Sequence, residues 1–227
     1  MLSRALVEIY SDQALATGLA FRGGTALHKL YLSPASRYSE DIDLLQIDAG
    51  PIGPMMTALR EHLDPWLGES RRKQSEGRMR FICRFDSEIP PIMPLRLKIE
   101  VNTREHFAVM GYVRQTAAVD NPWFRGQAEV VTHLLEELLG TKLRAFYQRK
   151  KGRDLFDLSV ALSRRRDLDC ARVVDCFSGT WKRRATPCSG LSSKRISTAS
   201  SPTQGRFWLQ PAARRTRSTC PRQRAPC

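Results

Sequence analysis

Two aspartates stand one residue apart in the segment RYSEDIDLLQ, which covers residues 37–46. Side chains two positions apart on a β-strand point to the same face, about 6–7 Å from each other. On a strand, Asp41 and Asp43 would therefore project together while Ile42 and Leu44 face the core. A carboxylate removed from water needs a basic neighbour, solvent or a metal ion to compensate it. The pair is suited to a divalent cation, which prefers hard oxygen ligands; a solvated strand face is the alternative.

Two consecutive glycines, Gly23 and Gly24, follow the apolar segment GLAFR and precede an expected helix over residues 25–32. Glycines between a strand and a helix let backbone amides approach a ligand, and the helix N-terminus favours anions. Gly23, Gly24 and Thr25 are therefore candidates for binding the phosphates of a nucleotide. An ordinary tight turn, with Thr25 helping to cap the helix, is the alternative interpretation.

A third acidic residue, Glu100, lies on the polar side of LRLKIEVN, a segment that alternates between apolar and polar residues. If this strand lies beside the strand of Asp41 and Asp43, three carboxylates converge. Such a group could hold one or two metal ions for phosphoryl or nucleotidyl transfer. The alternative is that Arg96 and Lys98 simply pair with Glu100 on a solvated face.

Lys142 falls three and four residues after Leu139 and Leu138, on the apolar stripe of an expected helix. A lysine there is costly unless it meets an anion or its ammonium group reaches water at the edge of the stripe. Asp154 opens the next expected helix, where it could cap the helix N-terminus. Its functional interpretation is that it supports Lys142 or activates a nucleophile.

Elements of both kinds must position these residues, and their order indicates an α+β fold: a mixed sheet with flanking helices, followed by a helical part and an irregular basic tail. We expect a core domain over residues 1–110, a helical part over 111–177 and an irregular tail over 178–227. The expected helices cover residues 3–16, 25–32, 54–67 (broken or kinked at Pro65), 129–150 and 154–165, and the expected strands cover 18–22, 41–47, 79–85 and 95–102.

The net charge of +14 is concentrated near the end of the chain. Residues 1–170 contain 25 basic and 22 acidic residues, whereas residues 171–227 contain 12 basic and 1 acidic residue. The cysteines form no CxxC pair, which gives no support for a zinc site. No apolar run approaches the length of a membrane span, and the first residues do not resemble a signal peptide, so we expect a cytoplasmic protein.

Four segments together resemble the AbiEii/AbiGii toxin family of nucleotidyltransferases, within the polymerase-beta-like superfamily. They are FRGGTALHKLY, RYSEDIDL, KIEVN and KLRAFYQRKKGRDLFDL, in the family's order and spacing. The resemblance covers about residues 3–170. It implies that Gly23, Gly24 and Ser39 lie in the nucleotide-binding region, that Asp41 and Asp43 bind the metal with Glu100 as a less certain third acid, and that Lys142 and Asp154 match the later functional residues.

The same resemblance implies a toxin of a toxin–antitoxin (abortive infection, phage defence) system with a cognate antitoxin encoded nearby. It implies transfer of a nucleotide from an NTP to an acceptor such as tRNA or another RNA, with Mg²⁺ or Mn²⁺ as cofactor. Two other functions stay open: a catalytically inactive remnant that only binds its antitoxin, and a basic RNA-binding protein dominated by its tail. The acid-free composition after Phe177 fits either a frame change or a native basic arm.

Overall fold

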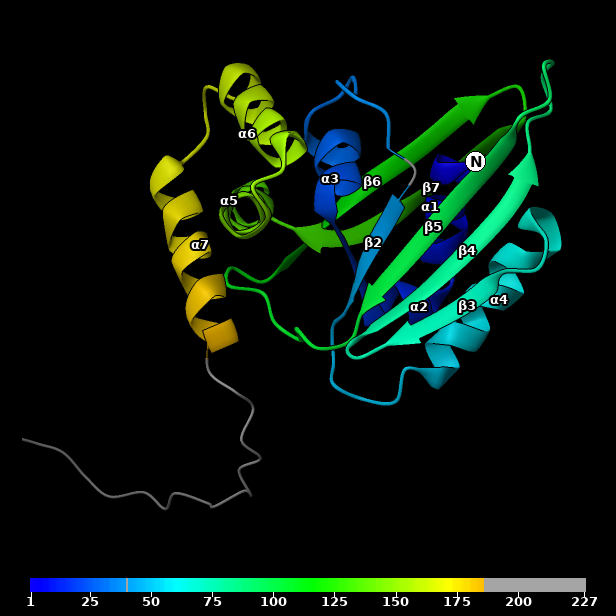
Figure 1. The fold of residues 1–227 in the computed structure, drawn as a ribbon, viewed down its shortest axis with the longest axis horizontal. Helices are drawn as coiled ribbons and strands as arrows, with labels where there is room; N and C mark the ends of the chain where they lie inside the picture. The colour runs from blue at the N-terminus through cyan, green and yellow to red at the C-terminus, as the bar shows by residue number, and fades with distance from the viewer. Residues whose placement is uncertain (40, 186–227) are drawn as a thin grey trace, which may run out of the picture. The chain divides into compact units, whose positions relative to one another are not determined.

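The computed structural model describes residues 1–39 and 41–185. Within these residues, seven strands form one mixed sheet in the order β3-β4-β5-β2-β1-β7-β6 (Figure 1). Strand β2 runs parallel to β5 and β1 runs parallel to β7, while the other neighbours are antiparallel. The strands are β1 (Leu19–Arg22), β2 (Asp41–Gln46), β3 (Arg71–Ser75), β4 (Arg78–Asp86), β5 (Pro94–Asn102), β6 (Tyr112–Asn121) and β7 (Phe124–His133).

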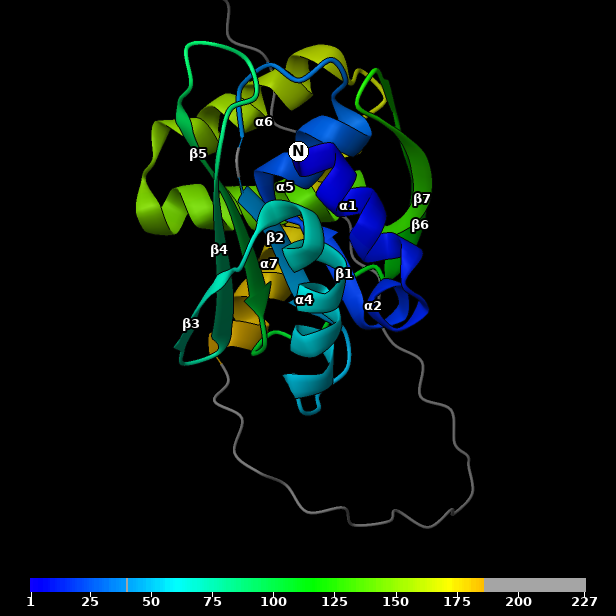
Figure 2. The ribbon, with the colours of Figure 1, turned by 90° about the vertical axis from the view of Figure 1, so that its right-hand side faces the viewer.

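Helices pack against one face of this sheet and beside its β2–β1 region (Figures 1 and 2). Helix α1 contacts β6 and β7, and α4 contacts β4, while α5 packs against α6 and α7. Of the described helices, none is both long and apolar enough to span a bilayer. The helical segments are α1 (Leu2–Ser11), α2 (Gln13–Gly18), α3 (Gly23–Ala26), the π-helical turn η1 (Leu27–Tyr31), α4 (Gly53–Leu67), α5 (Leu135–Arg149), α6 (Gly152–Arg164) and α7 (Cys170–Ala185).

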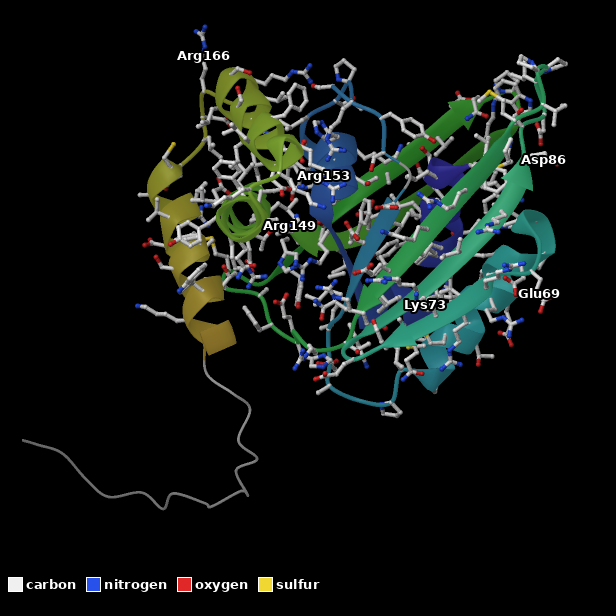
Figure 3. The ribbon with its side chains drawn as sticks, viewed as in Figure 1. Glu69, Lys73, Asp86, Arg149, Arg153 and Arg166 are labelled. Carbon is white, nitrogen blue, oxygen red and sulfur yellow. The ribbon has the colours of Figure 1, made fainter. Side chains whose placement is uncertain are left out.

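The two faces of strands β4 and β5 have opposite character, because successive side chains on a strand point to opposite sides. The apolar face is buried and includes Met79, Phe81, Cys83, Leu97, Ile99 and Val101. The other face is lined with charged side chains, among which Figure 3 labels Lys73 on the neighbouring strand β3. The alternation read from the sequence therefore separates a core face from a polar face, as expected for these two strands.

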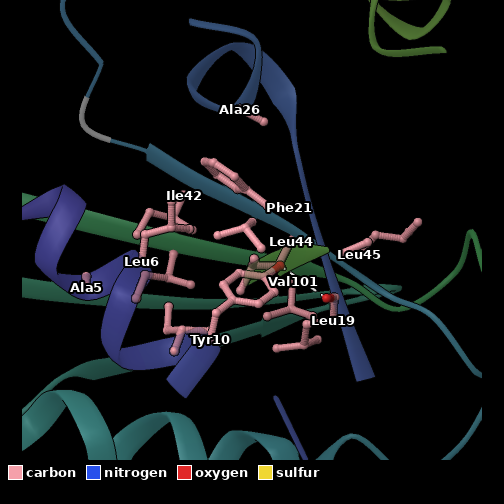
Figure 4. Close-up of a cluster of buried hydrophobic side chains, with 14 of the residues drawn as sticks. Ala5, Leu6, Tyr10, Leu19, Phe21, Ala26, Ile42, Leu44, Leu45 and Val101 are labelled. Atoms are coloured by element: carbon pink, nitrogen blue, oxygen red, sulfur yellow. Dashed lines mark hydrogen bonds between the residues drawn. The ribbon is translucent and has the colours of Figure 1, made fainter. Parts of the chain in front are cut away.

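Helix α1 seals the core over the centre of the sheet (Figure 4). Its Leu6 side chain is buried in one cluster with Phe21 of β1 and Ile42 of β2. The Tyr10 hydroxyl group lies within hydrogen-bond distance of two backbone carbonyl oxygens, 3.1 Å from that of Leu19 and 3.3 Å from that of Val131. Burial of this apolar cluster on one side of β2 forces the alternate residues of β2 to the opposite side.

The expected α+β class is confirmed, but the boundaries in the middle of the chain are not. Residues 111–177 were expected to be helical, whereas residues 112–133 form the antiparallel pair β6–β7. The helix expected from residue 129 begins at Leu135 instead. The β-branched run at residues 130–132 is buried and extends the sheet beyond β1, where Phe21 lies opposite Thr132.

Strand β3 was not expected, because its sequence RRKQS contains no apolar residue and all five residues are exposed. Backbone pairing with β4 rather than burial places it at the sheet edge. Pro65 does not break α4, which continues to Leu67. The single helix expected over 3–16 is divided at Asp12, whose side chain accepts a hydrogen bond from the Leu15 amide and caps α2.

Helix α7 extends to Ala185, so residues 178–185 are helical and the expectation of an irregular tail from residue 178 is wrong for them. Thr180 is buried against α5, and the ring of Trp181 packs edge-on against Tyr147 with 5.2 Å between centroids. Packing on α5 thus orders a segment whose own apolar pattern is weak. The expected irregular tail over residues 186–227 lies outside the described residues.

We predict that Gly140→Ala will destabilise the protein, because α5 and α7 approach each other most closely there. A Cβ atom at residue 140 would lie 2.8 Å from Cys176 Cβ and 2.9 Å from the Phe177 backbone nitrogen. Such overpacking should lower the free energy of unfolding by about 1–3 kcal/mol in urea melts.

Gly152→Ala is the matched control for this variant. Its added Cβ would meet no described atom within 4 Å, so it should leave stability unchanged or raise it slightly. If Gly140→Ala proves as stable as Gly152→Ala, the close crossing of α5 and α7 is wrong.

Candidate active site

A polar cavity of about 380 Å³ opens beside the Asp41–Asp43 end of β2. Its walls come from β2 and β5, the start of α3, and helices α5 and α6. Of the residues singled out from the sequence, only Asp154 is outside its lining. The lining includes Arg22, Gly23, Gly24, Thr25, Arg37, Ser39, Asp41, Asp43, Arg78, Lys98, Glu100, Glu105, Lys142, Arg144, Arg149 and Arg153.

Asp41 and Asp43 both face this cavity, since the core takes up Ile42 and Leu44 on the other side of β2. Asp41 pairs with Lys98 on β5, with 2.9 Å between its carboxylate and Nζ. Within the described residues, the Asp43 carboxylate forms no hydrogen bond or ion pair. The two carboxylates therefore share one face but differ in how far the protein compensates them.

Burial raises the pKa of Asp43 above its ordinary value, and this effect outweighs the opposing charge of Arg22. The neighbouring carboxylates of Glu100 and Asp41 raise the pKa further. A bound cation would favour the ionised form of Asp43 and remove this penalty. The electrostatics of the site thus leave a place for positive charge beside Asp43.

Glu100 joins Asp41 and Asp43 in the lining of the cavity and lies opposite Asp43 in the parallel pairing of β5 with β2. Its carboxylate lies 2.7 Å from Arg80 and 3.6 Å from Arg78, nearer than Lys98 at 3.9 Å. In the described part of the chain, no three acidic, histidine or cysteine side chains are placed to hold one metal ion. The role of Glu100 as a third metal ligand therefore stays a prediction.

Other side chains approach residues 23 and 24 so closely that only glycine fits there, and the backbone geometry of residue 23 also favours glycine. Gly23 has φ of +82°, a conformation that strains other residues, and any Cβ there would collide with the Asp43 carboxylate. A Cβ at Gly24 would collide with the guanidinium of Arg37 and crowd Lys142. The missing side chains let charged groups from three elements meet at the start of α3.

Thr25 and Ser39 connect this glycine turn to β2. The Thr25 hydroxyl donates to the Asp41 carbonyl oxygen at 2.6 Å, and the hydroxyls of Thr25 and Ser39 are hydrogen-bonded to each other. Thr25 is buried and does not cap the helix, so the alternative interpretation of a capping residue is wrong. Both hydroxyls hold the turn and the aspartate strand in a fixed relation at the edge of the cavity.

Lys142 extends from α5 between two buried aspartates of α6. Its Nζ atom lies 3.2 Å from Asp154 and 2.9 Å from Asp157, and its side chain is 10% exposed. Asp154 also pairs with Arg149 at 3.1 Å. The structure therefore places Asp154 behind Lys142, where it contacts the lysine but does not line the cavity.

Asp157 is the main site residue that the sequence analysis missed. Its fully buried carboxylate pairs with Arg37 at 2.7 Å, with Lys142 at 2.9 Å and with His28 at 2.9 Å. Burial alone would raise the pKa of Asp157, but the hydrogen bonds and charges of Arg37, Lys142 and His28 lower it well below its usual range. Its spacing of three residues from Asp154, on one face of a helix, is the sequence signal that could have identified it.

A half-buried carboxylate, Glu105, holds two arginines that also line the cavity. It lies 2.9 Å from Arg22 and 3.0 Å from Arg144. Burial raises the pKa of Glu105, but the charges and hydrogen bonds of the two arginines outweigh this and lower it. No motif in the sequence pointed to this group, because its members come from β1, the loop after β5, and α5.

The cavity thus combines two carboxylates with basic groups held in place by buried acids. Arg149 and Arg153 add exposed positive charge from α5 and α6 (Figure 3). Such a lining is suited to a polyanionic ligand that brings a cation with it, as a nucleoside triphosphate does. It offers little apolar surface for an uncharged ligand.

Comparisons with known proteins agree with this geometry. The family described as nucleotidyl transferase AbiEii toxin, of type IV toxin–antitoxin systems, matches residues 4–225. The solved structure of MenT4, a nucleotidyltransferase toxin from Mycobacterium tuberculosis, is similar at 20% identity with a TM-score of 0.60, over 78% of this chain and 61% of MenT4. That of JHP933 from Helicobacter pylori is similar at 20% identity with a TM-score of 0.53, over 81% of this chain and 73% of JHP933.

At these identities the solved structures show a shared fold, and this chain spans about three fifths of the length of MenT4. A comparison with curated protein sequences found no match. The family match spans residues 4–225, a range that includes the glycine turn, β2 and α5. The chain therefore belongs to the AbiEii family of nucleotidyltransferase toxins.

Proposed function

We propose that this cavity transfers a nucleotide from an NTP to an acceptor hydroxyl group in a metal-dependent reaction. The observation that supports this most strongly is that Asp41, Asp43, Gly24 and Lys142 line a single cavity. An NTP needs both a cation for its phosphates and basic groups for its remaining charge. Transfer of a nucleotide from a nucleoside triphosphate uses both the cation and the basic groups.

Asp41 and Asp43 would hold the metal, Mg²⁺ or Mn²⁺. They fit this role because both present carboxylate oxygens to the cavity and because burial leaves Asp43 without a partner among the described residues. Glu100 is the candidate third ligand, and its carboxylate pairs with Arg80 as that of Asp41 pairs with Lys98. When bound, the ion would neutralise charge on the phosphates during transfer.

Gly23 and Gly24 would bind phosphate oxygens through their backbone, beside the Ser39 hydroxyl. Lys142 and Arg37 would add positive charge in the same cavity. Asp154 and Asp157 would not touch the nucleotide; they would position these two basic side chains at 2.7–3.2 Å. Preorganised charge of this kind stabilises a transition state because it needs no rearrangement during the reaction.

We propose an RNA acceptor such as tRNA, and a cognate antitoxin as protein partner, from membership in the AbiEii family. The reaction would take place in the cytoplasm, where NTP and RNA are present. A toxin of this kind would act by modifying an RNA that the cell needs.

Asp41→Asn and Asp43→Asn should each abolish nucleotide transfer, because each removes one ligand charge with little change in volume. Transfer of a labelled nucleotide from an NTP to total RNA, with and without MgCl₂, measures this. If both variants keep wild-type magnesium-dependent activity, the metal assignment is wrong.

The same two variants should differ in stability without metal. A raised folded-state pKa means that ionised Asp43 destabilises the fold at pH above its ordinary pKa, and that this penalty fades as pH falls through the folded pKa. Asp43→Asn should therefore raise the melting temperature at pH 8 and raise it less at pH 5. Asp41→Asn, which loses the Lys98 pair, should not raise it. An equal gain for both variants at both pH values would contradict the unequal compensation of the pair.

Lys142→Met should abolish transfer and weaken NTP binding while it lowers the free energy of unfolding by about 3 kcal/mol, because two buried carboxylates lose a partner. Stability alone cannot separate a catalytic lysine from a structural one. Gly140→Ala is the matched control, since it should lose similar stability on the same helix without touching the cavity. At a temperature where both variants are folded, only Lys142→Met should lose NTP binding in calorimetric titration. Equal NTP binding by both variants would leave Lys142 with a structural role only.

A further inference from the structure

Strands β3, β4 and β5 present a strongly basic surface on the side away from α4. The register of the three strands places seven basic side chains on this side and two acidic ones, Asp86 and Glu100. We call this surface the basic face; its basic members are Arg71, Lys73, Arg78, Arg80, Arg84, Arg96 and Lys98. No described helix covers it, and Figure 1 shows these strands open toward the viewer.

The register concentrates positive charge on this side of the sheet. Lys73 lies directly opposite Arg80, and Arg84 lies directly opposite Arg96, in the antiparallel pairs of the sheet. Like charges at directly opposed positions repel each other unless an acid compensates them, as Glu100 does for Arg80. A bound anion would be attracted to such a surface.

Part of this charge is uncompensated. Glu100 pairs with Arg80, and Asp41 pairs with Lys98. By contrast, the exposed side chains of Arg71, Lys73 and Arg84 form no ion pair within the described residues. These three groups are available to a partner in solution.

The basic face continues into the cavity. Arg78, Lys98 and Glu100 belong to both, so the strands form a path from the sheet edge at β3 to Asp41 on β2. Three steps between neighbouring strands cover about 14 Å. A short single-stranded segment of a few nucleotides is long enough to follow this path.

We propose that the basic face binds the phosphate backbone of a single-stranded nucleic acid and directs its terminal hydroxyl group toward Asp41 and Asp43. This inference rests on the proposed function, because it supplies the acceptor for that reaction. The cavity of about 380 Å³ is small beside a duplex, so we take the acceptor end that reaches Asp41 and Asp43 to be single-stranded. Basic groups on a flat sheet contact phosphates and not base edges, which makes the binding independent of sequence.

The test compares two triple variants of the full chain that remove the same charge. Arg71→Ala/Lys73→Ala/Arg84→Ala removes the unpaired groups of the basic face and no residue of the cavity. Arg60→Ala/Arg114→Ala/Arg166→Ala removes three exposed arginines from α4, β6 and the α6–α7 loop. The probe is a fluorescein-labelled single-stranded RNA oligonucleotide, titrated by fluorescence anisotropy at several salt concentrations. Residues 186–227 are the same in both variants, so their arginines contribute equally.

The basic-face variant should bind the oligonucleotide roughly 10- to 100-fold more weakly at about 0.15 M salt, and the slope of log affinity against log salt should fall by about 2. The control variant should change neither quantity by more than about twofold. Equal losses in the two variants, or none in the basic-face variant, would overturn the inference. Binding of polyglutamate with equal affinity and equal loss would also overturn it, in favour of an acidic protein partner.

NTP binding separates this inference from the proposed function. The basic-face variant should bind NTP with MgCl₂ as the wild type does, since none of its three residues lines the cavity. Failure of the wild type to bind NTP would contradict the proposed function, whatever the oligonucleotide result. Normal NTP binding with no selective loss of oligonucleotide affinity would contradict only the basic face.

Discussion

The buried carboxylate of Asp157 is the interaction on which the rest of the site depends. It joins Arg37, Lys142 and His28, and so fixes the turn before β2, helix α5 and the π-helical turn η1 to helix α6. A fully buried carboxylate is tolerated only with such partners, and removing any one of them leaves the others imperfectly compensated. Because the partners come from segments far apart in sequence, the carboxylate can form this group only in the complete fold.

The acids of the site differ in how far basic side chains compensate them. Asp157 and Glu105 are each held by two or more basic groups, which lowers their pKa values and keeps those basic groups in place. Asp43 has no such partner among the described residues, and its pKa is raised by burial. The fold thus compensates the acids that position side chains, and Asp41 through Lys98, but leaves Asp43 uncompensated. Gly23 permits this arrangement, because any side chain there would displace the Asp43 carboxylate.

Local patterns in the sequence predicted the elements that bring Gly23, Asp41, Glu100 and Lys142 to one cavity, since alternation and helical spacing fix the face on which a side chain lies. They failed where tertiary contacts decide the structure. Strand β3 has no apolar residue and exists through backbone pairing with β4. Residues 178–185 continue helix α7 where Thr180 and Trp181 contact Arg144 and Tyr147 of α5. The partners of Asp157 and Glu105 could not be predicted, because they come from elements without a shared local motif. Spacing suggested a third carboxylate at Glu100, and strand pairing places Arg80 beside it.

The sheet combines these local and tertiary effects in one structure. Its apolar face, closed by α1 and α4, supplies the burial that stabilises β4 and β5. Because that face stabilises the strands, the opposite face can hold like charges at opposed positions that would weaken an isolated hairpin. The exposed charges of the basic face and the enclosed charges of the cavity then meet on β5, where Lys98 contacts Asp41 and Glu100 contacts Arg80. Strand β5 is therefore the element that connects the surface charge to the aspartate pair, and its alternation between apolar and charged residues makes both possible.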